Sequence, residues 1–423
     1  MSSFTAEASS DRPTSRDLVI SLEEAQQLIL GAVAPLAPRA VALAGARGLV
    51  LARDVIASEM VPPFANTAMD GFAVRAADTA GASETTPATL RIVGEVAAGH
   101  APTIAVGAGE AVRIMTGAPV PEGADAIVMV ERTRADSDAV AIFREAGRGD
   151  HVRPAGGDLE AGQQVFDAGT MLTPAHLGVL ASLDIAEVWC YPRPRVGVCS
   201  TGDELVASGP LAPGMIRDSN RPMLLAVLEE AGCDAVDCGI ARDDEQTLTT
   251  TITKAVDECD ALVTSGAVSM GDYDFVKVVL ERLASKRPQS SYAWMQVAIK
   301  PAKPLAFAAI GGVPVFGLPG NPVSSRVSFE LLARPALRRL AGHPDVLAEP
   351  VTALAASAFR RRADGRVHFD RVQVRYEDGH YLCERAGVQA SNVLSGMAAA
   401  TGLARLEDGE GVEAGDPVQV ILL

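Results

Sequence analysis

The chain has 423 residues, of which 48% are hydrophobic and 21% are charged, with 39 glycines and 26 prolines. This length exceeds what one hydrophobic core can serve, so we expect roughly two to four domains, and the composition excludes a disordered chain. The formal net charge of −16 argues against non-specific binding to nucleic acid and against attachment to an anionic membrane. An anionic ligand would therefore need a local basic pocket.

The cysteines and the apolar runs indicate the cellular compartment in which the protein is expected. The six cysteines show no CxxC spacing and stand mostly in apolar surroundings, which predicts reduced, structural thiols. The sequence shows no signal-peptide pattern, and no apolar run approaches the roughly 20 residues that span a bilayer. We therefore expect a cytoplasmic protein. Residues 1–20 are polar and rich in Ser and Thr, and are expected to form a disordered tail.

The first helix signal lies at residues 21–33, where Ser21 and Glu24 form a capping-box pattern ahead of apolar residues at helical spacing. Short β-prone runs separated by Gly, Pro and Asp follow within residues 66–154. They predict a small β domain inserted into a linker and helical domain made of residues 21–65 and 155–194. A further helix is expected within residues 173–185, before the proline-rich segment YPRPR.

From residue 195 the chain alternates between strand and helix patterns. The β-prone runs are 195–200, 233–240, 260–266 and 313–318, and the helical runs are 222–232, 245–259, 275–284 and 323–340. This alternation predicts a multidomain α/β protein with a doubly wound parallel sheet in residues 195–342, whose ligands lie beyond the carboxyl ends of the strands. Residues 343–423 return to short strands and are expected to form a separate β domain.

Chemically active side chains follow four of these predicted strands. They occur at residues 200–204, at Asp243 and Asp244, in TSGAVSMGDYD at 264–274, and in GLPGNPVSS at 317–325. Because the carboxyl ends of parallel strands share one edge, the hydroxyls and backbone amides of these turns would suit a phosphate or another oxyanion. Carboxylates beside such a site predict a divalent cation. The alternative is that each segment is an ordinary helix cap.

The segment KPAKP at 300–304 is a second unusual feature. Pro301 and Pro304 restrict the backbone around Lys300 and Lys303, so two ammonium groups are held at a set spacing, which suits an oxyanion. A charge pair in a surface loop is the alternative. The sequence contains no Walker loop, HExxH, GxSxG or helix-opening GxGxxG, and its six histidines lack the spacing of zinc ligands.

A series of motifs in chain order resembles the molybdopterin molybdenumtransferase family, which includes the C-terminal domain of gephyrin. The motifs are AMDGFAVR, RIMTGAPVPEGAD, STGDEL, RDD, SGAVSMGDYDFVK, AIKPAKP and GLPGNPVS. The resemblance covers nearly the whole chain from about Ser21. It implies an enzyme that takes adenylylated molybdopterin and molybdate, with Mg²⁺, and releases molybdenum cofactor and AMP in the last step of cofactor biosynthesis. It also implies an elongated homodimer of four-domain subunits, with a molybdopterin-adenylating enzyme as upstream partner.

The same resemblance implies roles for individual residues. Molybdate would bind near Lys300, Lys303, Pro304 and Ser324, together with Arg366 or Arg371 and Ser395. The pterin and the nucleotide phosphates would lie against Ser265, Gly266, Pro319, Gly320 and Asn321. The carboxylates that bind the cation and take part in catalysis would be Glu204, Asp243 and Asp274. Positions that reach the site from the partner subunit are matched by Asp70, Thr116 and Asp158, of which the first two otherwise give only weak turn signals.

Three positions depart from the family pattern. The usual SGGVS is SGAVS here, with Ala267, and the usual KPGKP is KPAKP, with Ala302. Four positions before Lys300, where a basic residue is common in the family, this chain has Gln296. An added methyl group limits the backbone, and a lost positive charge weakens anion binding. Two alternatives stay open at this point: a non-catalytic scaffold or pterin-binding protein on the same fold, and an enzyme that hydrolyses another nucleotide-linked substrate. The preference between molybdate and tungstate also stays open.

Overall fold

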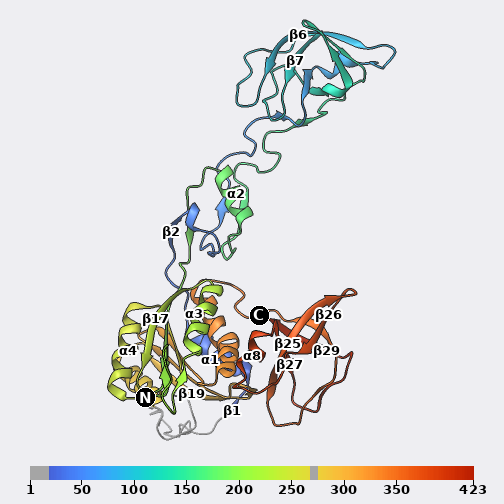
Figure 1. Ribbon diagram of the computed structural model, residues 1–423. Helices are drawn as coiled ribbons and strands as arrows, with labels where there is room; N and C mark the ends of the chain where they lie inside the picture. The colour runs from blue at the N-terminus through green and yellow to red at the C-terminus, as the bar shows by residue number, and fades with distance from the viewer. Residues whose placement is uncertain (1–18, 267–274) are drawn as a thin grey trace, which may run out of the picture. The chain divides into compact units, whose positions relative to one another are not determined.

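The computed structural model describes residues 19–266 and 275–423, which form two compact units (Figure 1). The first unit contains the described residues up to Arg39, Gly48–Ala52 and those of Cys190–Leu423. The second unit contains Ala40–Arg47 and Arg53–Trp189. Among the described residues, none of the helices is both long enough and apolar enough to cross a membrane. All six cysteines are free thiols, and all but Cys238 are buried.

A seven-stranded sheet forms the centre of the first unit. In spatial order its strands are β1 (Val19–Ile20), β19 (Ser291–Val297), β21 (Pro304–Ile310), β22 (Val313–Leu318), β18 (Ala261–Ser265), β14 (Arg195–Thr201) and β17 (Asp234–Ala241). The predicted strands β17, β14, β18 and β22 are neighbours and run parallel. Their carboxyl ends therefore share one edge of the sheet, as the sequence predicts.

One strand of this sheet differs from the expected parallel pattern. β21 runs antiparallel to both β19 and β22, so the sheet is mixed. A two-residue turn joins β21 to β22, and its residues Gly311 and Gly312 have φ angles of 61° and 87°. A Gly-Gly pair between two apolar runs is a hairpin signal, because tight hairpin turns need positive φ angles that glycine adopts without strain. The sequence thus contained the signal for β21.

Helices cover both faces of the seven-stranded sheet. They are α1 (Leu22–Gly31), α3 (Asn220–Glu230), α4 (Glu245–Glu258), α5 (Phe275–Lys286), α6 (Pro322–Ser328) and α7 (Arg334–Leu340). One apolar core contains buried residues of α1, α3, α6 and α7. A second core contains those of α4 and α5. The predicted helix at 323–340 is interrupted by a π-helical segment at Phe329–Ala333. Pro335 follows one residue after this segment and has no N–H to donate to the preceding turn.

Helix α1 belongs to the first unit, whereas the sequence had suggested a linker and helical domain for residues 21–65. Its capping box is present, because the Glu24 N–H donates to Ser21 Oγ at 3.1 Å and the Ser21 N–H donates to Glu24 Oε2 at 2.8 Å. The helix buries Leu22, Ala25 and Ile29 in the core beside the seven-stranded sheet. This apolar stripe needs a large core to cover it, which explains why α1 packs there.

A second sheet of the first unit lies in the C-terminal part of the chain. Its strands in order are β20 (Ile299–Lys300), β25 (Val367–Glu377), β26 (His380–Arg385), β23 (Val351–Ala355), β29 (Pro417–Leu422) and β27 (Gly402–Leu406). β25 also pairs with β27, so five of these strands close into a small barrel. Strands β24 (Phe359–Arg360) and β28 (Gly411–Val412) pair separately, and α8 (Leu394–Ala398) is a short helix. β20 pairs with β25 and so joins the segment at 300–304 to this barrel.

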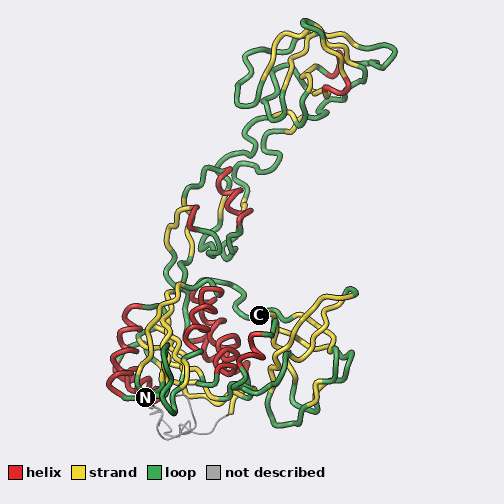
Figure 2. The backbone as a smooth tube through the Cα atoms, viewed as in Figure 1, coloured by secondary structure: helices red, strands yellow, loops and turns green. Residues whose placement is uncertain are grey.

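The regular elements of the second unit are mostly strands, which are joined by long loops (Figure 2). Its six-stranded sheet has the order β8 (Ala126–Met129), β5 (Gly71–Val74), β7 (Glu110–Ile114), β6 (Ala88–Val96), β10 (Ala139–Ile142) and β9 (Thr133–Ala135). Three short pairs accompany it: β4 (Asn66–Thr67) with β11 (Val152–Arg153), β3 (Val55–Ile56) with β12 (Gln164–Phe166), and β2 (Arg39–Ala42) with β13 (Glu187–Cys190). The predicted helix within 173–185 is α2 (Pro174–Ser182). Short 3₁₀ turns occur at Leu43–Gly45, Ala76–Thr79 and Val130–Arg132.

Candidate functional site

A cavity of about 820 Å³ opens at the carboxyl edge of the parallel strands in the first unit. Its wall includes the residues that follow β14, β18 and β22, the segment at 299–304, and residues of the C-terminal part of the chain. The predicted site residues that line it are Glu204, Ser265, Gly266, Lys300, Lys303, Pro304, Pro319, Gly320, Asn321, Ser324 and Arg366. Residues far apart in the sequence therefore meet in one place.

The side of the cavity nearest the sheet is neutral and closely packed. The Asn220 amide Nδ2 donates to Ser265 Oγ and to the Gly320 carbonyl, both at 2.7 Å, and so ties the ends of β18 and β22 together. Gly266 has a φ angle of 114°, and a Cβ atom there would lie 2.1 Å from the Thr201 carbonyl oxygen. Only glycine fits this close approach, so the turn after β18 presents backbone at the cavity wall.

Another part of the cavity wall, here called the basic side, contains Lys300, Lys303 and Arg366. Lys300 ends β20 and stands opposite His368 of β25 in the strand register. Lys303 follows two residues after Pro301, and its carbonyl accepts a 2.7 Å hydrogen bond from the Val297 N–H. Between the two lysines, Ala302 is buried and has a φ angle of 84°. That angle belongs to the left-handed region, which an alanine adopts only against its steric preference.

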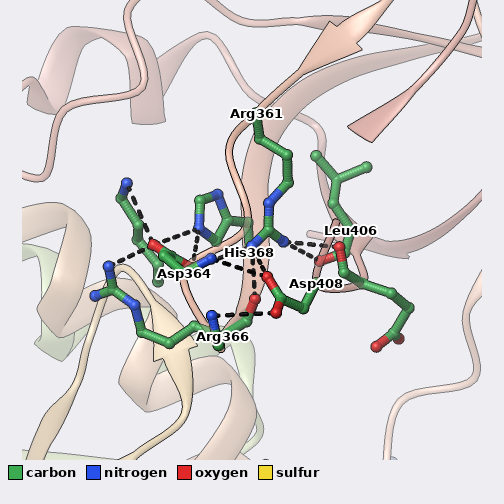
Figure 3. A network of polar contacts seen from close by, with 9 residues as sticks. Arg361, Asp364, Arg366, His368, Leu406 and Asp408 are labelled. Atoms are coloured by element: carbon green, nitrogen blue, oxygen red, sulfur yellow. Dashed lines mark hydrogen bonds and ion pairs between the residues drawn. The ribbon is translucent and has the colours of Figure 1, made fainter. Parts of the chain in front are cut away.

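The guanidinium of Arg366 stands beside Lys300 on the basic side, and a polar network holds both groups (Figure 3). Asp364 is at the centre of this network. Its Oδ2 lies 4.0 Å from Lys300 Nζ and accepts a hydrogen bond from Arg366 Nη2. Its Oδ1 accepts a hydrogen bond from Arg361 Nη2 at 3.1 Å, and His368 Nε2 lies 3.2 Å from both oxygens. The basic side is therefore an organised set of charges.

Carboxylates stand at the ends of β14 and β17. Glu204 lines the cavity. Burial raises the pKa of Asp243, and the negative charges of Glu204 and Asp203 raise it further. Asp243 Oδ1 is buried and has no hydrogen-bond partner in the described part of the chain. A buried carboxylate oxygen without a donor, facing other negative charges, is chemically suited to a cation.

The remaining predicted metal ligand, Asp274, lies outside the described residues, as does Ala267. Within 19–266 and 275–423, no group of three or more His, Cys, Asp or Glu side chains is arranged to hold a metal ion. Asp244 follows the helix-cap alternative, because its Oδ1 accepts a 2.8 Å hydrogen bond from the Thr247 N–H at the start of α4. The two neighbouring aspartates thus have different environments.

Besides Asp243, two predicted residues of the first unit are absent from the cavity wall. Arg371 in β25 is fully buried, and its Nη2 donates to the Val388 carbonyl. Ser395 is exposed on α8. Of the two arginines that the sequence left open, Arg366 is the one at the cavity.

Three predicted residues belong to the second unit. The Thr116 N–H and Oγ1 both donate to Asp70 Oδ1 at 2.6 Å, and these hydrogen bonds lower the pKa of the Asp70 carboxyl. Both residues are exposed. Asp158 is also exposed, and its N–H donates to the Val61 carbonyl at 2.9 Å. Asp70 and Thr116 therefore form one polar feature on the surface of the six-stranded sheet.

Several polar residues of the cavity wall were not predicted. They are Asp218, Asn220, Gln389, Ser391 and Asn392. Asp218 is buried, accepts a 2.9 Å hydrogen bond from Ser200 Oγ, and pairs with Arg221 Nε at 2.9 Å. The run RDSN directly before the helical pattern at 222–232 was the available signal for Asp218 and Asn220. The sequence shows no comparable signal for residues 389–392.

Comparisons with known proteins agree over nearly the whole chain. Family models match as "MoeA N-terminal region (domain I and II)" at residues 20–183, "Probable molybdopterin binding domain" at 197–339 and "MoeA C-terminal region (domain IV)" at 353–423. Molybdopterin molybdenumtransferase 2 of Mycobacterium tuberculosis is 39% identical over 402 residues, which cover 95% of this chain and 98% of that protein. The molybdopterin molybdenumtransferase of Haemophilus influenzae is 37% identical, with 88% and 90% covered. The crystal structure of the molybdopterin biosynthesis MoeA protein from Pyrococcus horikoshii OT3 superposes with a TM-score of 0.81 at 29% identity, covering 96% of this chain and 100% of that one.

Proposed function

The chain belongs to the molybdopterin molybdenumtransferase family, a transferase family of molybdenum cofactor biosynthesis, and we propose that its cavity is where adenylylated molybdopterin receives molybdate. In this reaction molybdate becomes bound to the dithiolene of the pterin, and the phosphoanhydride to the nucleotide is broken, so that molybdenum cofactor and AMP leave. The observation that carries the proposal is the division of one cavity into a neutral, backbone-lined side and a basic side.

The neutral side suits the pterin and the phosphates. Backbone at Gly266 and Gly320 can approach a phosphate closely because neither residue has a side chain, and Ser265 adds a hydroxyl. Pro319 and Asn321 complete this part of the wall. The tie from Asn220 to both strand ends holds these groups in place, so they need not reorganise when an anion binds.

The basic side suits molybdate. Lys300, Lys303 and Arg366 present cationic donors to the same cavity, whose wall also includes Pro304 and Ser324. A tetrahedral oxyanion with two negative charges is attracted to such a cluster, and a guanidinium can donate two hydrogen bonds to it. The net charge of −16 makes this local concentration of positive charge more notable. Molybdate would therefore be held in the same cavity as the phosphates.

The carboxylates fit a magnesium ion. Asp243 and Glu204 would hold it, and Asp274 would join them; the unpartnered Oδ1 of Asp243 and its raised pKa support this assignment. Bound Mg²⁺ would supply positive charge that stabilises the phosphate oxygens while the phosphoanhydride breaks. Glu204 and Asp243 would hold such a cation at the carboxyl ends of β14 and β17.

The direct test is an assay of the purified protein with adenylylated molybdopterin, Mg²⁺ and molybdate. We expect AMP to be released, and active molybdenum cofactor to form, only when all three are present. The alternative of a pterin-binding scaffold predicts binding of adenylylated molybdopterin without AMP release. Release of AMP at the same rate without molybdate would instead favour an enzyme that hydrolyses the nucleotide-linked substrate.

We also propose that the enzyme works as a homodimer in which Asp70, Thr116 and Asp158 of one subunit serve the cavity of the other. The support is that Asp70 and Thr116 form an exposed polar pair in the second unit, away from its apolar cores. An Asp70→Ala protein mixed with a Lys303→Ala protein would then regain activity, because a heterodimer has one intact site. Random mixing should restore about a quarter of the wild-type activity. Confirmed heterodimers without recovery would contradict this arrangement.

The proposed reaction also implies an upstream enzyme and a cellular compartment. Its substrate must come from an enzyme that adenylylates molybdopterin, which we propose as the upstream partner. The six free thiols suit a reducing compartment, so we place the reaction in the cytoplasm. Proximity labelling in cells, with the adenylating enzyme as the bait, would test both proposals together.

A further inference from the structure

One carboxylate gathers the cationic groups on the basic side of the cavity (Figure 3). Asp364 contacts both Lys300 and Arg366, the two groups of its network that line the cavity. Its second oxygen faces Arg361, and His368 bonds to both of its oxygens. A single side chain therefore contacts two of the groups that are proposed to bind molybdate.

The loop that carries Asp364 is itself fixed. The N–H groups of Asp364 and Gly365 donate to Asp408 Oδ1 and Oδ2 at 3.0 Å and 3.1 Å. Arg361 has only 2% of its side chain exposed, and it donates to Asp408 and to the carbonyls of Leu406, Glu407 and Arg366. A carboxylate held in this way can orient its partners, whereas an ordinary pair of exposed charges contributes little because both side chains move freely.

The charges of the network also favour an anion. Burial alone would raise the pKa of Asp364, but hydrogen bonds from Arg366 and His368 and their positive charges lower it to about 2. Burial lowers the pKa of His368, an effect that Arg361 and Lys300 strengthen and Asp364 opposes. Near neutral pH the cluster thus contains three fixed cations, Lys300, Arg361 and Arg366, against the carboxylates Asp364 and Asp408. Positive charge is left over for a ligand.

We propose that Asp364 is a positioning residue of the oxyanion subsite, which holds the Lys300 ammonium and the Arg366 guanidinium on the cavity wall at a fixed separation. The inference rests on the proposed function, because molybdate is the oxyanion assigned to these two groups. About half of the Lys300 side chain and a third of the Arg366 side chain are exposed, with values of 51% and 30%. Without Asp364 their mutual repulsion would move both groups toward solvent.

A competing role for Asp364 makes the opposite prediction. A carboxylate that occupies Lys300 and Arg366 could compete with molybdate, and its removal would then tighten molybdate binding. The geometry favours positioning, because Asp364 bonds to Arg361 and His368 as well and therefore stays in place when its other partners bind a ligand. Positioning predicts weaker molybdate binding after its removal.

The test compares Asp364→Asn with Glu384→Gln in the AMP-release assay, after circular dichroism has shown that both variants are folded. Asparagine keeps the size of the side chain and one acceptor oxygen. For Asp364→Asn we expect the half-saturating molybdate concentration to rise by roughly tenfold, as for the loss of one charge-assisted interaction, while that of adenylylated molybdopterin is unchanged. Glu384→Gln removes a carboxylate from an exposed ion pair with Arg375 in the same barrel, outside the cavity wall, and both half-saturating concentrations should stay at their wild-type values.

A double-mutant cycle with Arg366→Gln separates positioning from a structural effect. If Asp364 acts through Arg366, the Asp364→Asn change should have a much smaller effect on the molybdate half-saturation in the Arg366→Gln background. Should Asp364→Asn fail to fold, Asp364→Glu provides the cycle instead, since it keeps the charge and displaces it by one methylene group.

Three results would overturn the inference: an unchanged or lower half-saturating molybdate concentration in Asp364→Asn, equal increases for both substrates, or additive effects in the cycle. A wild-type protein whose AMP release does not depend on molybdate would overturn the proposed function, and this inference with it. The wild-type titration therefore distinguishes the two failures.

Discussion

The turn after β18 and the segment at 300–304 face the same cavity, and each contains a residue with a positive φ angle. At Gly266 the angle is 114°, and an added Cβ would meet the Thr201 carbonyl oxygen at 2.1 Å. At Ala302 the angle is 84°, yet the residue has a Cβ atom, and that residue is buried with 5% exposure. The backbone of the neutral side therefore requires a residue without a side chain at Gly266. The backbone of the basic side accommodates a methyl group at Ala302, and the properties of that side come from its charged groups.

The largest effect should come from Gly266→Ala. The methyl group would overlap the Thr201 carbonyl, which is backbone of the neighbouring strand and cannot move aside, and the φ angle adds strain. We expect a loss of roughly 3 kcal/mol or more in the free energy of unfolding, measured by urea denaturation. The control is Gly320→Ala in the adjacent turn, where the nearest atom to a Cβ lies at 3.6 Å, an ordinary contact. Similar losses in both variants would show that close packing at Gly266 is not special.

The next effect should separate the two neighbouring aspartates after β17. Asp243→Asn removes the charge of a carboxylate whose buried Oδ1 lacks a donor, so we expect a folded protein whose rate of AMP release at saturating substrate falls by about 100-fold. Asp244→Asn should retain the wild-type rate, because asparagine caps a helix as well as aspartate does. Equal rates in the two variants would assign both residues to helix capping and leave the cation without Asp243.

The basic side should respond to charge more than to shape. Lys303→Ala removes one ammonium group, and we expect the half-saturating molybdate concentration to rise by roughly 10- to 100-fold, corresponding to about 1 to 3 kcal/mol. Binding of adenylylated molybdopterin, measured by calorimetry, should change little. Lys254→Ala on the exposed face of α4 removes the same charge away from the cavity and serves as the control. An unchanged molybdate half-saturation would remove Lys303 from the oxyanion subsite.

The sequence could predict those parts of the fold that have a distinctive local pattern. Parallel strands and their helices produce strong patterns, because buried strands are continuous apolar runs and covering helices are amphipathic. β21 was missed because a buried antiparallel strand has the same apolar run as a parallel one, and only the Gly311-Gly312 turn distinguishes it. The place of α1 was missed because an apolar stripe does not specify which core will cover it.

The neutral side of the site was predictable and part of the basic side was not. Residues at the ends of adjacent parallel strands must share an edge, so Ser265 and Gly320 could be grouped from the sequence. Asn220 joins those strand ends across separations of 45 and 100 residues, which no local pattern reveals. The choice between Arg366 and Arg371 depends on where each side chain points from one strand and its preceding loop, and the role of Asp364 depends on contacts that reach from β20 to residue 408.

The smallest effect should come from Ala302→Gly, and it measures how the basic side tolerates its left-handed alanine. Glycine relieves about 1 kcal/mol of backbone strain at a φ angle of 84°. It also loses a buried methyl group, worth about 0.8 kcal/mol, and adds freedom to the unfolded chain, worth roughly 0.5 kcal/mol, so the free energy of unfolding should fall by only about 0.3 kcal/mol. Ala306→Gly is the matched control, because Ala306 is equally buried in β21 but has no positive φ angle. It should lose at least 1 kcal/mol, from the methyl group and from the added freedom of glycine in the unfolded chain. The difference between the two alanines, obtained from urea denaturation, isolates the strain relief. Equal losses would show that Ala302 is not strained and that the basic side, like the turn after β18, is set by packing.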